Sequence, residues 1–457
     1  MSWFDDDVLR PDPERRGRIL PVLNAALDAV EPGAAVARVL QRAGDVLRVG
    51  ERVYHLDDFE RVLVLAVGKA ATPMAQAVLG LGLRLDTGLV ITKYGHGPTQ
   101  AGALAPLEVI EAGHPVPDAM GVAAAHRAAE IISRATEKDL IITLISGGGS
   151  ALLTLPAADI TLRDLQKTTE LLLASGATIA EINVVRKHLS LVKGGQLARM
   201  AAPATIISLI LSDVIGNPLD VIASGPTVAD ASTWADAWAV IERYRLQQSL
   251  PEPVRRLLLR GVAGLLPDTP GPDDPIFSRV QNFIVGDNAI AAAAARIAAE
   301  EQGFAATILS TYVQGEAREV ARVLVALGRE MVTHQRPLSP PACLIMGGET
   351  TVTLRGTGKG GRNQEMALAA AIDLSHTPDA DPIVIVALAT DGTDGPTDAA
   401  GGIVDSSAVE RGKAVGLNAQ AHLENNDAYS WLKATNNLLF TGPTRTNVND
   451  LYFVFAF

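Results

Sequence analysis

The chain has 457 residues, of which 48% are apolar and 20% are charged, a composition that excludes global disorder and indicates two or three domains. Its formal net charge of −12 disfavours general binding to nucleic acid or to anionic membranes. A single cysteine (Cys343), eight histidines without metal-ligand spacing, and an acidic N-terminus without an apolar core indicate a cytoplasmic enzyme without a disulfide or a signal peptide.

The first half of the chain predicts a parallel sheet covered by helices. Two helices are expected within residues 14–48, separated at Pro32, and further helices start near Pro73 and at residues 119, 162, 234 and 253. The helical region from residue 162 extends to 199, with a break near Gly176. Because parallel sheets are buried on both faces, their strands are continuous apolar runs, and these occur at residues 61–67, 89–92, 107–112, 140–145 and 204–211.

A second domain is predicted beyond residues 267–274, PDTPGPDD, where prolines and aspartates cluster as in a linker. The predicted domains span residues 1–266 and 275–457. Residues 342–346 and 350–355 are expected to form a hairpin-like pair around Gly347 and Gly348. Other strands are expected at residues 282–285, 305–309, 383–389 and 451–455, and the sequence leaves open which domain contains the last one.

Polar residues follow six of the apolar runs, at the strand ends where ligands bind in open α/β sheets, and we therefore expect one shared site. The most distinctive segment is residues 146–150, SGGGS, between a predicted strand and a predicted helix. Glycine lets another group approach the backbone, and N–H groups at a helix start bind anions such as phosphate. The segment also fits a tight turn that binds nothing.

Two charged residues occupy similar positions after strands. Lys69 could bind a phosphate or a carboxylate, or it is simply an exposed lysine. Asp213 could act as a general base toward a hydroxyl group or as a Mg²⁺ ligand, or it caps a turn. Neither residue type decides between these roles alone.

The segment 355–362, RGTGKGGR, contains the spacing G-x-G-x-x-G, but its three cations and its late position in the chain are unusual for a dinucleotide site. We interpret it as a basic, mobile loop that binds phosphate, with Arg362 as the main donor. A glycine-rich turn with solvated charges is the alternative. The sequence has no Walker A motif, kinase catalytic loop or G-x-S-x-G elbow.

Two later loops are also polar. Asp391, Asp394 and Asp398 lie in one loop that lacks the final glutamate of a calcium-binding loop, so a Mg²⁺–nucleotide contact or a capping role for the next helix is favoured. Residues 441–450 offer threonine and asparagine side chains, including Asn447, to a polar ligand. They could equally form a plain loop before the last strand.

Together these motifs resemble one family, the class II glycerate kinases, which are glycerate 2-kinases with a C-terminal MOFRL domain. One departure is Arg445, at a position where glycine is common in the family. The resemblance covers almost the whole chain and rests on AVGKAA (66–71), GHPVPD (113–118), ISGGGSALL (145–153), INVVRKHLSLVKGGQLA (182–198), LSDVIGNPLDVIASGPT (211–227), GGETTV (347–352), GKGGRNQEMAL (358–368), ATDGTDGPTDAAGGIVD (389–405) and TGPTRTNVNDL (441–451).

The resemblance implies ATP-dependent phosphorylation of D-glycerate at its 2-hydroxyl group, with Mg²⁺ as the accompanying metal. It implies a Rossmann-like N-terminal domain with a parallel sheet and a smaller α/β C-terminal domain, with the active site in the interdomain cleft. The expected partners are small molecules rather than nucleic acid or membrane, and the expected state is a monomer or homodimer. Because the expected catalytic cations lie on different domains, hinge closure on ligand is also predicted.

The candidate site residues follow from the motifs and the resemblance together. The resemblance implies catalytic roles for Lys69, Asp213 and Arg362, and Asp213 is also the expected metal ligand. Nucleotide or phosphate binding is expected from Ser146, Gly147, Gly148, Gly149, Ser150, Glu349, Lys359 and Asp391. Substrate binding is expected from Lys69, Arg186, Asn217, Arg362 and Asn447.

The sequence leaves two alternative functions open. An NAD(P)H-dependent hydroxypyruvate reductase has its only local support in the glycines of residues 356–361. A non-catalytic sensor of nucleotides or phosphosugars is the second alternative, although no DNA-binding module or effector domain is recognisable in the sequence.

Overall fold

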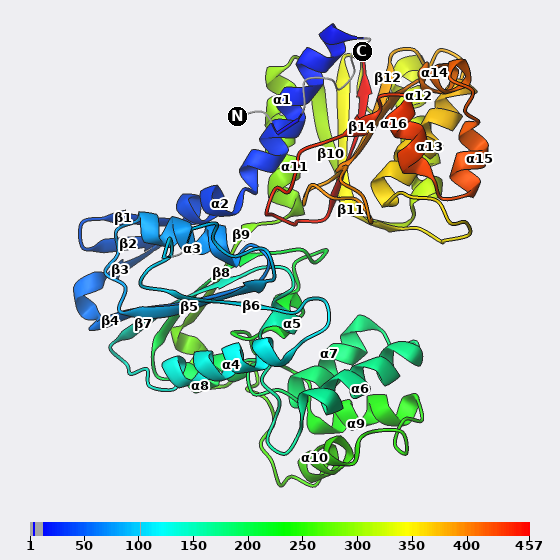
Figure 1. Cartoon of the computed structure of the whole chain (residues 1–457). Coiled ribbons are helices and arrows are strands. Elements are labelled where there is room, and N and C mark those ends of the chain that lie inside the picture. The colour runs from blue at the N-terminus through cyan, green and yellow to red at the C-terminus, as the bar shows by residue number, and fades with distance from the viewer. Residues whose placement is uncertain (1–2, 5–11, 101) are drawn as a thin grey trace. The chain divides into compact units, whose positions relative to one another are not determined.

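The computed structural model describes residues 3–4, 12–100 and 102–457, which fold into two compact units (Figure 1). The central unit is Pro32–Val285, and the terminal unit combines Met1–Glu31 with Gly286–Phe457. Each unit has its own six-stranded sheet. The acidic stretch that disfavours a signal peptide, residues 1–16, lies mostly outside the described residues.

The main sheet of the central unit has the strand order β6-β5-β4-β7-β8-β9. Its first strand in the chain, β4, lies in the middle and pairs in parallel with β5 on one side and β7 on the other. This order, with the chain moving outward first to one edge and then to the other, is Rossmann-like and confirms the predicted fold class. The strands are β4 (Arg61–Val67), β5 (Thr87–Lys93), β6 (Glu108–Ala112), β7 (Asp139–Ile145), β8 (Thr205–Leu211) and β9 (Val280–Gly286).

Helices cover both faces of this sheet (Figure 1). Side chains of Leu65, Ile141 and Ile206 pack against α4 and α8 in one apolar core, while α3 packs against β4 and β5. Every residue of β7 is buried, which explains why its sequence is apolar apart from Asp139 and Thr143. The helices are α2 (Pro32–Val39), α3 (Ala71–Gly80), α4 (Ala119–Ile132), α5 (Gly149–Leu152) and α8 (Gln196–Ala201), with 3₁₀ turns at Leu56–Asp58, Ile222–Ser224 and Pro275–Arg279.

Four further helices of the central unit pack around a core of their own, which includes Leu172, Val185 and Trp234. They are α6 (Leu162–Ala174), α7 (Ile179–His188), α9 (Trp234–Arg243) and α10 (Glu252–Val262). Capping boxes begin α6 and α7, because Thr161 and Thr178 each exchange hydrogen bonds with an acidic residue three positions later. The helical region expected at residues 162–199 is therefore three separate helices, α6, α7 and α8.

Residues 40–55 form a small antiparallel sheet rather than the end of a helix. Its strands are β1 (Leu40–Ala43), β2 (Val46–Val49) and β3 (Arg52–His55). Gly44 and Gly50 have φ angles of +62° and +58°, which tight hairpin turns need and a right-handed helix does not allow. The helical prediction for the last part of residues 14–48 is therefore wrong.

The sheet of the terminal unit is mixed, with the order β10-β11-β15-β12-β13-β14. Only the pair β10–β11 is parallel, and β15 runs antiparallel to both β11 and β12. The last strand of the chain therefore lies inside the sheet of this unit. The strands are β10 (Ala305–Glu316), β11 (Ala342–Thr351), β12 (Ile383–Ala389), β13 (Gly401–Asp405), β14 (Leu438–Leu439) and β15 (Asp450–Ala456).

Helices cover this second sheet too, and the first helix of the chain is one of them. The buried side chains of α1 include Val22, Leu23 and Leu27, and its Arg18 guanidinium lies 4.1 Å from the centre of the Phe304 ring. α1 packs on α11, while α12 and α13 share a core with Leu344 (Figure 1). The helices are α1 (Pro13–Ala29), α11 (Asn288–Glu301), α12 (Ala317–His334), α13 (Arg362–Ser375), α14 (Ala408–Ala414), α15 (Ala419–Glu424) and α16 (Ala428–Ala434).

In the described part of the chain, no single helix is both long and apolar enough to cross a bilayer. α1 and α2 meet that criterion only when taken together, and they are bent by 62° relative to one another.

The predicted hairpin around Gly347 and Gly348 is wrong, because β11 runs through both glycines as one strand. A Cβ atom at position 347 would lie 1.7 Å from Asn288 Oδ1, and one at position 348 would lie 2.0 Å from the Val313 carbonyl oxygen. The two glycines thus allow close approach of neighbouring groups to a continuous strand, and no turn is formed.

The units differ from the expected domains in two places. α1 belongs to the terminal unit, and the first sheet continues through β9, beyond the expected linker at residues 267–274. That linker packs within the central unit: Thr269 donates to Asp230 Oδ2 at 3.0 Å, and the Pro270 carbonyl accepts from the Asp230 amide at 2.9 Å. The proline-rich segment 267–274 is therefore an ordered connection within the central unit. The boundary between the two units lies after Val285.

Candidate functional site

The strand order of the central unit reverses at the carboxyl ends of β4 and β7, its two middle strands. The chain leaves β4 toward one edge of the sheet and leaves β7 toward the other, so the loops that follow them diverge and leave room for a ligand. Val67 and Ile145 end these strands side by side in the same register. Lys69 and the segment Ser146–Ser150, here called the glycine loop, therefore emerge next to each other.

Three functional side chains surround the glycine loop. A Cβ atom at position 147 would lie 2.2 Å from Asp213 Oδ2, so glycine is required for the carboxylate to come this close. A Cβ atom at position 148 would lie 2.9 Å from His114 Cδ2 and 3.5 Å from Lys69 Cγ, and Gly148 has a φ of +86°. The structure thus brings Lys69, His114 and Asp213 together around one turn of backbone.

Hydrogen bonds fix the glycine loop against the neighbouring strand end. The Lys69 amide donates to the Gly147 carbonyl at 2.9 Å, and the Ala70 amide donates to Ser146 Oγ at 3.0 Å. Ser146 is only 1% exposed, so its hydroxyl group joins the two loops. The Lys69 side chain is therefore held beside the loop by its own backbone.

A strained segment supports the other end of the glycine loop. Ala223 and Ser224 have φ angles of +50° and +61°, a region that non-glycine residues rarely occupy. The Ser224 hydroxyl lies 2.9 Å from the Ser150 hydroxyl, and a Cβ atom at position 149 would lie 3.0 Å from Ala223 Cβ. Backbone strain of this kind accumulates at functional sites, where surrounding contacts maintain it.

The three side chains have different charges at neutral pH. Burial, and then the positive charges of Lys69, Lys93 and His96, lower the pKa of His114 to about 4, so its imidazole is neutral at pH 7. The cluster therefore combines an ammonium group, a carboxylate and a neutral imidazole. An ammonium group can bind an anion, and a carboxylate can accept a proton from a hydroxyl group.

The metal-binding capacity of this cluster is limited to one carboxylate. The described residues contain no group of three or more His, Cys, Asp or Glu side chains able to hold a metal ion. Mg²⁺ in phosphoryl-transfer enzymes is commonly held by one or two carboxylates together with substrate phosphates and water. Asp213 with bound phosphates fits that arrangement, whereas a metal site built from protein alone does not.

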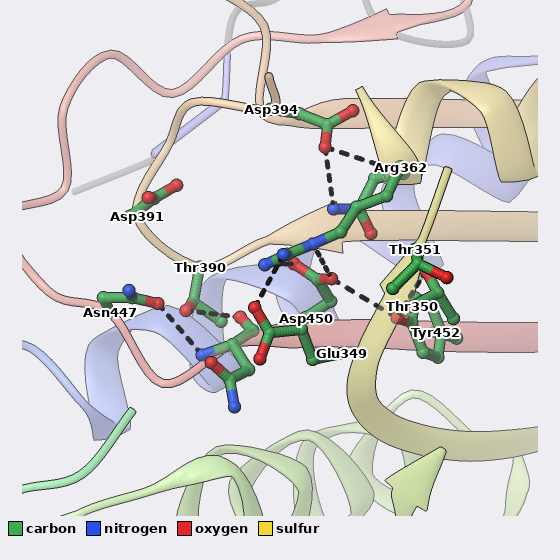
Figure 2. Close-up of polar contacts among 12 residues, drawn as sticks. Glu349, Thr350, Thr351, Arg362, Thr390, Asp391, Asp394, Asn447, Asp450 and Tyr452 are labelled. Atoms are coloured by element: carbon green, nitrogen blue, oxygen red, sulfur yellow. Dashed lines mark hydrogen bonds and ion pairs between the residues drawn. The ribbon is translucent and has the colours of Figure 1, made fainter. Parts of the chain in front are cut away.

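The terminal unit contains a second cationic centre, Arg362, shown in Figure 2. Its Nε lies 2.5 Å from Asp450 Oδ2, and its Nη1 donates to Glu349 Oε1 at 2.8 Å. The Asp450 side chain is 1% exposed, while that of Glu349 is 47% exposed. The buried Asp450 carboxylate therefore orients the guanidinium group. Glu349 contacts the guanidinium group from the solvent side, and a ligand could replace this exposed carboxylate at a low cost in free energy.

Arg362 occupies an electrostatically unfavourable place, the first residue of α13, where the helix dipole is positive. The buried Asp394 caps the same helix end by accepting hydrogen bonds from the Asn363 and Gln364 amides. Burial raises the pKa of Asp450, and the positive charge of Arg362 opposes that rise. Of the two roles considered for the 391–398 loop, the structure shows capping by Asp394, directed at the preceding helix.

The basic loop at residues 355–361 is anchored by backbone hydrogen bonds. Asn425 and Asn426 side chains accept from amides of the loop, and Asp427 Oδ1 accepts from the Lys359 amide at 3.1 Å. The Lys359 ammonium lies 4.4 Å from the centre of the Tyr429 ring. The loop thus differs from the mobile phosphate-binding loop that its composition predicts. Side chains of residues 425–429 already contact its backbone amides and the Lys359 ammonium.

Most of the remaining predicted residues follow or precede the strands that end at these centres, whereas Arg186 lies apart from both. Asp391 follows β12 and Asn447 precedes β15, and these strand ends meet where Ala389 pairs with Asp450 (Figure 2). Asn217 forms a turn after Asp213 with a φ of +54°, and Arg186 points into a separate cavity beside α7. Arg445, at the position where glycine is common in the resembling family, has a φ of +62°, the conformation that glycine favours.

Two residues of these centres were absent from the predicted site. His114 lies within the GHPVPD segment, so the motif itself was the available signal. Asp450 likewise lies within the TGPTRTNVNDL segment, but its pairing with Arg362, 88 positions away in the chain, could not be read from that motif.

Family models match both units of the chain. Residues 18–259 match the domain of unknown function DUF4147, and residues 342–450 match the MOFRL family. The chain is 43% identical to the "Glycerate 2-kinase" of Pyrococcus horikoshii over 433 residues, which cover 94% of this chain and 95% of the relative. It is also 43% identical to the "D-glycerate 2-kinase" of Thermotoga maritima over 442 residues, covering 96% and 98%.

Two further comparisons agree in extent. The solved structure of a glycerate kinase from Thermotoga maritima has a TM-score of 0.87 at 41% identity and covers 98% of this chain and all of that chain. A "Putative hydroxypyruvate reductase" of Agrobacterium vitis is 42% identical over 394 residues, covering 86% of both chains. The chain therefore belongs to the class II glycerate kinase family, whose members combine a DUF4147 domain with a MOFRL domain.

Proposed function

We propose that the protein is a glycerate 2-kinase, which transfers the γ-phosphoryl group of ATP to the 2-hydroxyl of D-glycerate and releases 2-phospho-D-glycerate and ADP. The observation that carries this proposal is the arrangement of Lys69, His114 and Asp213 around the glycine loop at the switch point of the sheet. Phosphoryl transfer requires mainly positioning and neutralisation of charge, and this site offers both.

In the proposed reaction, Asp213 orients the 2-hydroxyl group and accepts its proton as the oxygen attacks the γ-phosphorus. The new O–P bond forms while the bond between the γ-phosphorus and the bridging oxygen of ADP breaks. Lys69 neutralises charge on the phosphoryl oxygens, and Arg362 contacts the second anionic group of the substrates. The proton leaves Asp213 to solvent once the product has dissociated.

Glycine-loop residues Gly147–Ser150 are proposed to contact the nucleotide phosphates, and Glu349, Lys359, Asp391, Asn217 and Asn447 remain proposed ligand contacts. We propose Mg²⁺ as the metal, held by Asp213 with the phosphates, where it would neutralise the negative charge of ATP. A cytoplasmic location and a monomeric or homodimeric state are further parts of the proposal.

The reductase alternative loses its local support once the glycines of residues 356–361 are placed. Cβ atoms at positions 356 and 358 would collide with Asn425 and Asp427, at 2.4 Å in each case. These glycines thus serve packing against the segment 425–428, which accounts for them without a bound dinucleotide. The name of the Agrobacterium vitis relative is therefore not transferred.

One product assay decides between the candidate functions. The purified protein is incubated with ATP, Mg²⁺ and D-glycerate, and 2- and 3-phosphoglycerate are separated and quantified alongside ADP. Formation of 2-phosphoglycerate is expected. Oxidation of NADH with hydroxypyruvate would instead indicate the reductase, and absence of both reactions would leave a sensor.

Residue roles are tested separately. Lys69→Ala and Asp213→Asn are each expected to lower kcat by at least about 100-fold, the scale of a lost electrostatic or proton-transfer group. Lys138→Ala, which removes an exposed lysine that precedes β7 and, among the described residues, pairs only with the exposed Glu60, provides the matched control. Near-wild-type turnover by a folded Lys69→Ala protein would remove this residue from the mechanism.

A further inference from the structure

A cavity of about 360 Å³ lies in the central unit beside the glycine loop. One wall comes from α6 and α7, and the other from residues 115–117, which follow His114. Ser150, the last residue of the glycine loop, lines its inner end. The size falls in the range of small-molecule binding pockets.

Two cations face this cavity without a carboxylate partner. Arg186 lies in its lining and forms no ion pair with any described residue, and burial lowers its pKa. Lys193 is 6% exposed, and its ammonium donates to the carbonyl oxygens of Ser150 at 2.6 Å and Leu153 at 3.2 Å. The only acidic lining residue, Glu170, is directed to the exposed Lys167.

Holding two unpaired cations in a partly desolvated cavity opposes folding, so the arrangement points to a bound anion. Burial and the charge of Arg186 lower the pKa of Lys193 to about 7, as expected for two cations that lack a counter-charge. An anionic ligand would supply that counter-charge.

The rest of the lining is apolar and excludes a ligand that is polar throughout. Leu165, Leu172, Leu173, Val185 and Leu189 contribute to the walls. Two apolar side chains at the cavity are also exposed to solvent, Val116 by 63% and Leu173 by 62%. Glycerate has three carbons, each bearing an oxygen, and would leave these walls uncovered, whereas a flat heterocyclic base would cover them.

From this geometry we infer that the cavity binds the nucleoside and α-phosphate of ATP, with Arg186 at the phosphate and the base between α6 and the segment 115–117. The inference rests on the proposed kinase function. It also defines the orientation of the bound nucleotide, with the base in the cavity and the terminal phosphates at the glycine loop. Because Ser150 joins the cavity to the glycine loop, the β- and γ-phosphates extend from it toward Lys69. Lys193 connects the cavity with the glycine loop, because its ammonium group donates a hydrogen bond to the Ser150 carbonyl oxygen.

Arg186→Met is the decisive variant, since Arg186 has no ion-pair partner in the described chain to lose. Dissociation constants for ATP and for tripolyphosphate are measured by calorimetry without glycerate, and steady-state constants are measured with both substrates. ATP binding is expected to weaken at least about tenfold, with KM for glycerate unchanged within about twofold. Arg163→Met, an exposed arginine of α6 outside the cavity, is the matched control.

A second variant, Leu173→Trp, fills the mouth of the cavity without removing a charge. It is expected to weaken ATP binding at least about tenfold while leaving tripolyphosphate binding unchanged, because tripolyphosphate has no base. Melting temperatures without ligand show whether each variant is folded. If Arg186→Met fails to fold, the binding constants of Leu173→Trp test the inference on their own.

Unchanged ATP binding in folded Arg186→Met or Leu173→Trp proteins would overturn the inference, as would an increase confined to KM for glycerate. ATP binding by the wild-type protein that shows the expected losses, but without phosphorylation of glycerate, would support the cavity and reject the proposed function. Phosphorylation of glycerate by the wild-type protein, with ATP binding unchanged in both variants, would support the proposed function and reject the cavity as the nucleotide site.

Discussion

Arg362 has a structural role in addition to the chemical role proposed for it. It begins a helix, where a positive charge is unfavourable by about 0.3–1 kcal/mol. Its guanidinium group compensates the buried carboxylate of Asp450, with which it makes contacts of 2.5 and 3.2 Å. Substitution of Arg362 is therefore expected to affect stability, in addition to any effect on the proposed reaction.

Removing Arg362 alone is expected to destabilise the terminal unit. Arg362→Met would leave the Asp450 carboxylate buried and unpaired, at a cost of about 3 kcal/mol, whereas Arg362→Met combined with Asp450→Asn would recover most of that loss. Urea unfolding of the wild type, both single variants and the double variant measures this coupling. Additive effects of the two substitutions would contradict it.

Lys193 is predicted to make stability depend on pH. Its pKa is lowered to about 7 by burial and by Arg186, so between pH 7 and about 10 the unfolded chain binds more protons than the folded protein. The stabilising effect of deprotonating Lys193 is absent below pH 7 and grows as pH rises through this window. It amounts to at most about 1.4 kcal/mol per pH unit.

Comparison with Lys193→Met isolates this contribution. The free energy of unfolding of the wild type, minus that of the variant, is expected to increase from pH 7 to about pH 9.5 in urea titrations. Parallel pH profiles for the two proteins would show that Lys193 titrates normally in the folded state.

Among the elements, the glycine loop depends most closely on its residue types. Its glycines are required because Asp213 and His114 lie within 3 Å of where Cβ atoms would be. The loop therefore lets the Asp213 and His114 side chains lie close together, and this role is separate from any contact that its amides make with phosphate.

Gly147→Ala is expected to displace the Asp213 carboxylate and to lower kcat by at least about 100-fold with only a modest loss of stability, because the site lies on a loop. Gly271→Ala, at a glycine that like Gly147 has no positive φ but has open space around it, controls for the loss of backbone freedom. Turnover and melting temperature are measured for both. Equal effects of the two substitutions would show that the collision with Asp213 is unimportant.

The regular elements of the central sheet could be predicted from sequence because β4, β7 and β8 are buried on both faces and consist mostly of apolar residues. The positions of Lys69 and Asp213 followed, since both directly succeed such strands. Gly347 and Gly348 could not be interpreted in this way. The sequence does not distinguish a glycine that permits close packing in a strand from a glycine in a turn. Here the close contacts with Asn288 and Val313, which are distant in the sequence, require glycine within a strand.

At the scale of the whole molecule, one of the two units is assembled from both ends of the chain. The terminal unit takes its first helix from one end of the sequence and its sheet from the other. Local sequence contains no indication of this, because the apolar spacing of α1 would suit either unit. Its partners are α11 and Phe304, which follow the central unit in the sequence.

Deleting residues 1–31 is therefore expected to destabilise the terminal unit and to leave the central unit folded. The deletion removes five buried apolar side chains of α1 and exposes the surface of α11 that they cover. Limited proteolysis with mass spectrometry identifies which unit is cleaved first. Preferential cleavage within Pro32–Val285 would contradict the assignment of α1.

The position of α1 also bears on synthesis of the chain. A ribosome adding about 5–20 residues per second needs at least roughly 13 s to make the central unit after α1 has emerged. Throughout that time the apolar face of α1 has no partner, because α11 and β10 have not yet been translated. We expect α1 to be a chaperone-binding segment in the nascent chain, and crosslinking on ribosomes stalled before and after residue 316 would detect its release.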